Sequence, residues 1–138
     1  MGNIRELGNG MVVEGLDDDA ITVFQGAKYS RDGIDVWAQA VIDDINQDNK
    51  NIAHLHDMRT ASVVITPYVR KKLQDVGENR DNEGYVALVM TPNPLTNIVR
   101  FFVQREFKKD QPKVDMQLFF DYDEALTWLR ERVAGGSR

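Results

Sequence analysis

The sequence predicts a single α/β domain built on a mixed, mostly parallel five-stranded sheet with helices on both faces. Its 138 residues suit one domain. Two strand candidates, residues 11–14 and 20–25, are separated by too few residues to hold a helix, which predicts an antiparallel hairpin. Strand and helix patterns then alternate in the order β-β-α-β-α-β-α-β-α, which favours right-handed crossovers onto a parallel sheet.

The N-terminal hairpin begins with the short apolar segment 11–14 and turns in the acidic, glycine-containing segment 15–19. Its second strand, residues 20–25, carries Ile21 and Val23, which are β-branched residues with high strand propensity. Because the parallel part of the sheet follows this hairpin, we expect residues 11–14 to form an antiparallel edge strand.

Two helices with clear start signals are predicted next. Ser30 is the expected N-cap of the first helix, and Asp32 lies in the first turn, where a carboxylate stabilises the helix dipole. Thr66 and Pro67 have the pattern of an N-cap followed by proline at the first helical position. Apolar residues recur at helical spacing in both segments: Ile34, Trp37, Val41 and Ile45 in the first, and Val69, Leu73 and Val76 in the second.

The remaining strands are predicted at residues 52–56, 84–90 and 116–120. A turn at residues 91–94 starts a third helix. This helix carries Ile98 and an apolar stripe that contains Leu95, Val99, Phe102 and Val103. Phe101 lies off this stripe, so it either folds into the core or leaves an exposed patch that self-associates or takes an apolar ligand. Asp121 and Glu124 stand at capping-box spacing before the final helix.

Composition and the chain ends limit the class of protein. We expect residues 1–10 to be a flexible polar lead, residues 11–134 the domain, and residues 135–138 a frayed tail. The chain has no cysteine, which excludes disulfides and thiolate metal sites and fits a reducing, cytoplasmic compartment. A net charge of −5 argues against a nucleic-acid partner. No apolar run approaches the roughly 20 residues of a membrane span, so we expect no stable membrane insertion.

Several segments together resemble one known family. They are residues 23–26 (Val-Phe-Gln-Gly), Ser30 with Trp37, residues 55–57 (Leu-His-Asp), and residues 119–129 (Phe-Phe-Asp-Tyr-Asp-Glu-Ala-Leu-Thr-Trp-Leu). In these segments the chain is similar to the SpoIIAA-like family of the STAS-like group, which is related to lipid-binding CRAL-TRIO domains. The resemblance covers residues 11–133 and implies a small regulatory or ligand-binding module, usually without an established reaction.

The resemblance also implies a comparison with the phosphorylated site of partner-switching STAS proteins. There, a Ser or Thr at the start of the helix that follows an Asp-ending strand is the target of a kinase. In this chain Asp57 ends the strand, but Met58 follows it in place of the usual Ser. Thr60 and Ser62 are the substitutes by position, and whether a phosphoswitch survives stays open.

Asp57 is the most suggestive single residue for binding, because ligand sites in open α/β sheets lie beyond the carboxyl ends of parallel strands. A phosphate-accepting Asp57, as in receiver domains, would need an acidic pair at the end of a first strand that leads into a helix. The acidic run 17–19 falls in the predicted hairpin instead. A capping or turn-stabilising Asp57 is the alternative interpretation.

His54 and His56 are two residues apart, so on a strand they project from one face. Such a pair can bind zinc or copper, but a third ligand is needed and Asp57 projects from the opposite face. The alternative is a pair of hydrogen-bonded histidines partly covered by helices. We therefore predict no metal site.

No catalytic or cofactor-binding residue is assigned, since the Gly-x-Ser-x-Gly, Gly-x-Gly-x-x-Gly and Walker A patterns are all absent from the sequence. The leading hypothesis is a non-enzymatic STAS-like regulatory or protein-interaction domain. A second hypothesis is a carrier or sensor of a small apolar ligand or lipid. A third is a small enzyme of unrecognised type.

The predicted interaction site lies at the carboxyl edge of the sheet. It consists of Asp57, Arg59, Thr60, Ser62 and Thr91. The amides at the start of the helix that begins at Pro67 favour an anionic group, and Arg59 can add a charge-assisted contact. We also expect a two-fold homodimer, formed by the surplus apolar residues around Phe101.

Overall fold

The computed structural model describes a mixed α/β sheet over residues 4–18, 20–26, 30–48, 52–59, 66–78, 84–94, 96–110 and 113–136. Its strands are β1 (Ile4–Glu6), β2 (Val12–Leu16), β3 (Ile21–Gln25), β4 (Ile52–Asp57), β5 (Gly84–Val89) and β6 (Val114–Phe119). Its helices are η1 (Gly8–Gly10, 3₁₀), α1 (Arg31–Asp48), α2 (Pro67–Glu78), α3 (Thr96–Phe101), η2 (Phe102–Glu106, π), α4 (Phe107–Asp110) and α5 (Tyr122–Gly136).

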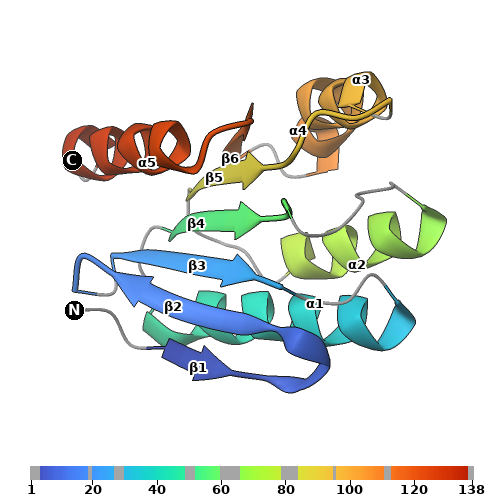
Figure 1. Ribbon diagram of the computed structural model, residues 1–138, viewed down its shortest axis with the longest axis horizontal. Coiled ribbons are helices and arrows are strands. Elements are labelled where there is room, and N and C mark those ends of the chain that lie inside the picture. Colours follow the sequence, from blue (N-terminus) through green and yellow to red (C-terminus); the bar gives the residue numbers. More distant parts are fainter. Residues whose placement is uncertain are drawn as a thin grey trace.

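The strands lie in the sheet in sequence order, from β1 to β6 (Figure 1). β1, β2 and β3 pair antiparallel, whereas β3, β4, β5 and β6 pair parallel. The predicted mixed, mostly parallel α/β architecture is thus confirmed.

The sheet has six strands rather than the five expected, because β1 pairs with β2 in the register Arg5↔Val13. The edge strand is therefore β1, and the prediction that residues 11–14 form the edge is wrong. β1 is only three residues long and all of its side chains are exposed, so no alternation of apolar and polar residues marks it.

Strand alternation sends side chains to two different helical layers. Phe24 of β3 packs with α1 and α2, whereas Val23, the preceding residue, packs in the cluster that includes Ala125 and Leu129 of α5. Val86 of β5 packs with the α3–α4 segment. The three crossovers after β3 thus place α1, α2 and α3–α4 on one face, and α5 covers the other.

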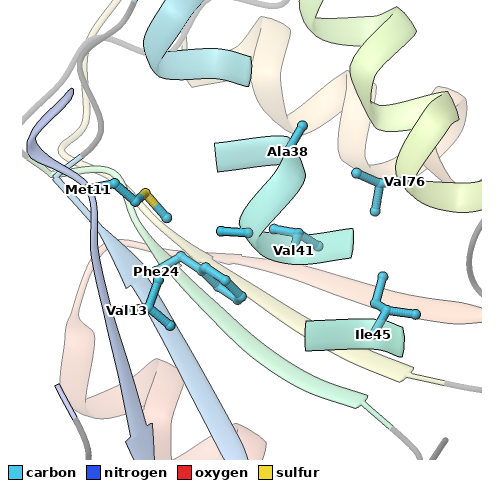
Figure 2. Close-up of a cluster of buried hydrophobic side chains, with 8 residues drawn as sticks. Met11, Val13, Phe24, Ala38, Val41, Ile45 and Val76 are labelled. Atoms are coloured by element: carbon cyan, nitrogen blue, oxygen red, sulfur yellow. The ribbon is translucent and has the colours of Figure 1, made fainter. Parts of the chain in front are cut away.

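The core beneath α1 shows how the hairpin and the first helix meet (Figure 2). Phe24 lies between side chains from the hairpin segment, from α1 and from α2. The labelled members are Met11, Val13, Phe24, Ala38, Val41, Ile45 and Val76. Phe24 and Met11 are almost fully buried, which for large apolar side chains contributes about 2–3 kcal/mol each.

The predicted helix starts are present. The Ser30 Oγ accepts a hydrogen bond from the Gly33 amide at 3.1 Å, and the Thr66 Oγ1 accepts one from the Val69 amide at 3.2 Å. Each hydroxyl satisfies an amide that has no partner within the first turn of its helix. Asp121 accepts from the Asp123 amide at 3.1 Å before α5, which extends to Gly136 and so runs two residues past the expected end of the domain.

Two glycines fix the approach of the N-terminal segment to the end of β3. Gly10 and Gly26 have φ values of +77° and +83°, in the left-handed region that glycine adopts without strain. A Cβ at Gly10 would lie 2.9 Å from the Gly26 carbonyl oxygen, and a Cβ at Gly26 would lie 2.6 Å from the Gly10 carbonyl oxygen. The contact between the two backbones therefore requires glycine at both positions.

The α3–α4 segment departs from a regular helix. In the π-helical turn η2 the Phe107 amide donates to the Phe102 carbonyl, so five residues close each turn and residues five apart share a face. Phe102 and Phe107 accordingly both point into the core, with ring centroids 6.3 Å apart. Ile98 is 59% exposed and Phe101, which lies off the predicted stripe, is 54% exposed. Leu95 lies outside the described residues.

Candidate functional site

β4 carries the polar side chains that the sequence singled out, and it divides them between its two faces. His54 and His56 point toward α1, whereas Asp57 belongs to the face covered by α5. All three residues are buried. Buried polar groups need hydrogen-bond partners, so the partners reveal what each residue does.

His54 is bonded to a carboxylate from the helix above it. Its Nε2 lies 2.8 Å from Oδ2 of Asp44, a residue of α1. The Thr22 hydroxyl of β3 donates to the same carboxylate, at 3.2 Å to each oxygen. This buried polar cluster joins two strands to α1.

His56 is held by aromatic neighbours. The indole Nε1 of Trp37 donates to its Nδ1 at 2.9 Å, and since an indole can only donate, that nitrogen carries no proton. Phe24 stacks on the His56 ring with centroids 5.0 Å apart and an interplanar angle of 12°. The arrangement orients the His56 ring with its Nδ1 lone pair toward the Trp37 indole.

The order of these contacts does not fit a nucleophile activated by a histidine. The Thr22 hydroxyl donates to the Asp44 carboxylate, whereas the nucleophile of a catalytic triad donates to the imidazole of the histidine. Within the described parts of the chain, no group of three His, Asp or Glu side chains is placed to hold a metal ion. The histidine face of β4 (His54, His56 and their partners) therefore serves the packing of α1.

Asp57 stands at the carboxyl end of β4 and binds the side chain of Arg59. The Arg59 Nε donates to Oδ1 at 2.8 Å and its Nη2 to Oδ2 at 2.7 Å, which is a bidentate pair. The Arg59 amide adds a third bond at 3.2 Å. Burial pushes the pKa of Asp57 upward, but the bonds and charge of Arg59 outweigh it and hold the pKa below the ordinary 3.8. Asp57 is therefore an anion at neutral pH.

Arg59 is the exposed half of this pair, and its surroundings come from three elements. Its side chain is 45% exposed, against 8% for Asp57. The guanidinium lies over the Tyr122 ring of α5 at 5.3 Å from the centroid. The Thr91 hydroxyl, beyond β5, donates to the Arg59 carbonyl at 3.4 Å. Burial raises the pKa of the Tyr122 hydroxyl, so this group stays neutral.

The structure thus brings together three of the five predicted site residues: Asp57, Arg59 and Thr91. Thr60 and Ser62 lie outside the described residues. Tyr122 was not among the predicted site residues, although it is the first residue of α5 and lies between Asp121 and Glu124, which the sequence singled out as a helix-start signal. We call Asp57, Arg59, Thr91 and Tyr122 the Arg59 edge.

A second surface feature lies on α3 and beyond β6. Ile98, Phe101 and Phe120 are 59%, 54% and 42% exposed, and we call these three residues the aromatic patch. The Arg100 guanidinium lies 5.8 Å from the Phe120 ring centroid, and that of Arg105 lies 5.5 Å from the Phe101 ring centroid. The sequence had left the position of Phe101 open, and the structure places it at the surface.

Comparison of the chain with protein-family models, with curated proteins and with solved structures gave no significant match. Among the described residues, no helix combines the length and the apolar character needed to cross a bilayer. What the structure establishes is a small α/β domain with a mixed six-stranded sheet.

Proposed function

We propose that the chain is a non-enzymatic, STAS-like regulatory domain that binds a protein partner at the Arg59 edge. The observation that carries this proposal is the combination of a rigid guanidinium with high exposure. Arg59 is oriented by two hydrogen bonds to Asp57 and still exposes 45% of its side chain. A side chain that is already ordered loses little further entropy when it binds.

The chemistry of the edge fits a protein interface. Arg59 and Tyr122 are of the residue types enriched among interface residues that carry most of the binding energy. Arg59 uses its Nε and Nη2 on Asp57, and its Nη1 makes no hydrogen bond with any residue that the structure describes. Nη1 can therefore donate to a carboxylate or a main-chain carbonyl of a partner.

The resemblance to partner-switching STAS proteins supports the same location, because their regulated residue follows an Asp-ending strand. By position, Asp57 matches that strand end. Thr60 and Ser62 are the substitutes by position for the phosphorylated residue, and a phosphate on either would lie within a few residues of Arg59 in the sequence. The proposed partner is thus one whose binding depends on Arg59 and responds to a charge added at residue 60 or 62.

The test is cross-linking of the tagged chain in its own cells, followed by binding measurements with the purified, identified partner. Arg59→Ala should weaken that binding at least about tenfold, as expected for a central interface arginine. Arg130→Ala is the matched control, because Arg130 also forms a bidentate pair with an aspartate, at 2.8 and 3.0 Å, and is 51% exposed. Equal affinities of the wild type and Arg59→Ala would reject the proposal.

A further inference from the structure

The aromatic patch places large apolar side chains at the surface of this domain, where they are exposed to solvent. Ile98 and Phe101 lie one turn apart on α3 and are both more than half exposed. The π-helical turn that follows explains why Phe102 and Phe107 are buried, but it gives Phe101 no contact with the core. Exposed apolar side chains that cluster in this way mark an interaction surface.

Charges of both signs border the patch. Arg100 and Arg105 lie over Phe120 and Phe101, and neither forms an ion pair with a described carboxylate. Arg100 instead donates to the Asn97 side chain at 3.2 Å. Directly after Phe120 come three exposed carboxylates: Asp121, which precedes α5, and Asp123 and Glu124 in its first turn.

We propose that a second copy of this chain docks on the aromatic patch in a two-fold contact. In such a contact each surface meets itself, so Arg100 and Arg105 of one copy can face the α5 carboxylates of the other while the aromatic side chains meet at the centre. A uniformly acidic partner would suit the two arginines but would be repelled by the three carboxylates. The self-complementary charge pattern therefore favours a second copy.

The expected dimer is weak and reversible. Three partly exposed side chains amount to much less than the roughly 800 Å² per partner of a standard stable interface. A dissociation constant in the micromolar range or weaker follows. The inference concerns the purified chain alone and a surface other than the Arg59 edge, so its test is separate from that of the proposed function.

Sedimentation of the purified chain over a range of concentrations tests the dimer. We expect monomer at low micromolar concentration and dimer as the concentration rises. Phe101→Ser should weaken association at least about tenfold, as loss of a central aromatic side chain does. Ile4→Ser is the matched control, since Ile4 is an apolar residue with 65% exposure on the opposite edge strand β1, and it should associate as the wild type does. A wild type that stays monomeric throughout, or a Phe101→Ser variant that associates normally, overturns the inference.

Charge reversal tests the two-fold pairing itself. One variant carries Arg100→Glu with Arg105→Glu, and the other carries Asp123→Lys with Glu124→Lys. Each alone should be more monomeric than the wild type, because the two-fold contact then brings like charges together. An equimolar mixture should recover a heterodimer, detectable by native mass spectrometry. If the mixture stays monomeric while the wild type associates, the proposed pairing of charges is wrong.

Discussion

The two polar sites of β4 have equally buried strand residues but very different partners. His54 and His56 receive their partners, Asp44 and Trp37, from α1, a helix that packs on the same face of the sheet. Asp57 receives its partner, Arg59, from two residues farther along the chain. The histidine bonds thus join distant segments, whereas the Asp57 bonds hold one local turn.

The difference separates a stabilising role from a binding role. A bond between distant segments is lost on unfolding together with the docking of α1, so it contributes to the stability of the whole domain. A local pair with an exposed arginine contributes less, because water and salt screen it. The same exposure makes Arg59 accessible to a partner. We therefore expect substitutions beneath α1 to change stability and substitutions at the Arg59 edge to change binding.

The largest expected effect is that of Asp44→Ala. It removes the carboxylate that binds both the buried His54 ring and the Thr22 hydroxyl. Breaking one partner of a buried pair costs about 3 kcal/mol. Denaturant unfolding measures the loss. Asp43→Ala is the control, since Asp43 is exposed and, among the residues that the structure describes, its side chain binds Gln39 of its own helix at 2.8 Å. Equal losses in the two variants would show that the buried polar cluster contributes no special stability.

An intermediate effect is expected for Trp37→Phe. The phenyl ring keeps most of the packing but cannot donate to Nδ1 of His56, and an unsatisfied buried acceptor costs about 1–2 kcal/mol. Denaturant unfolding of the wild type and the variant measures this loss. Trp128→Phe, which alters an indole that packs against Tyr85 and Phe119, is the control, and its loss of unfolding free energy should be smaller because the bond to His56 is kept.

The sequence predicted the elements that depend on local signals. Ser30 and Thr66 were found as helix caps because capping is set by residue type and by the three residues that follow. Asp57 was found because it ends an apolar strand. β1 was missed because its three exposed residues show no alternation of apolar and polar side chains. Its strand conformation depends instead on pairing with β2, which the segment itself does not reveal.

The partners of the histidines were missed for a related reason. In the sequence, nothing distinguishes Asp44 from the other acidic residues of the same helix. Only the packing of α1 over β3 and β4 brings it to His54 and Thr22. The position of Phe101 could not be settled from spacing either, because it lies beside the stripe that contains Val99 and Phe102. The helix α3 has only six residues before the π-helical turn, and its buried residues are Thr96 and Val99, so Phe101 stays at the surface.

The smallest expected effect on stability is at the Arg59 edge, and it should be unequal for the two members of the pair. Among the described residues, Arg59→Ala leaves the buried Asp57 carboxylate with the amide of residue 59 as its remaining partner, at a cost of about 1 kcal/mol after allowance for the exposure of Arg59. Asp57→Ala leaves a guanidinium that water can solvate, so its cost should be smaller. Because folded domains are typically stable by about 5–15 kcal/mol, both variants should remain folded in the partner-binding test.

The pH dependence of the stability lost in Arg59→Ala shows whether the ion pair with Asp57 causes that loss. The pKa of Asp57 in the folded state lies below 3.8, so its ion pair stabilises the fold at pH values above 3.8, and the contribution disappears as the pH falls through the folded-state pKa. Unfolding free energies of the wild type and Arg59→Ala should therefore differ by a constant amount near neutral pH and converge in acid, as Asp57 becomes protonated first in the variant, where burial raises its pKa, and then in the wild type. Arg130→Ala provides the comparison. The pKa of its partner Asp17 is also lowered, chiefly by the hydrogen bond from Arg130, but both members of that pair are solvent-exposed. The loss of unfolding free energy in Arg130→Ala should be smaller than that in Arg59→Ala and should vanish in high salt. An equal and salt-sensitive loss in Arg59→Ala would mean that the burial of Asp57 adds nothing to its ion pair.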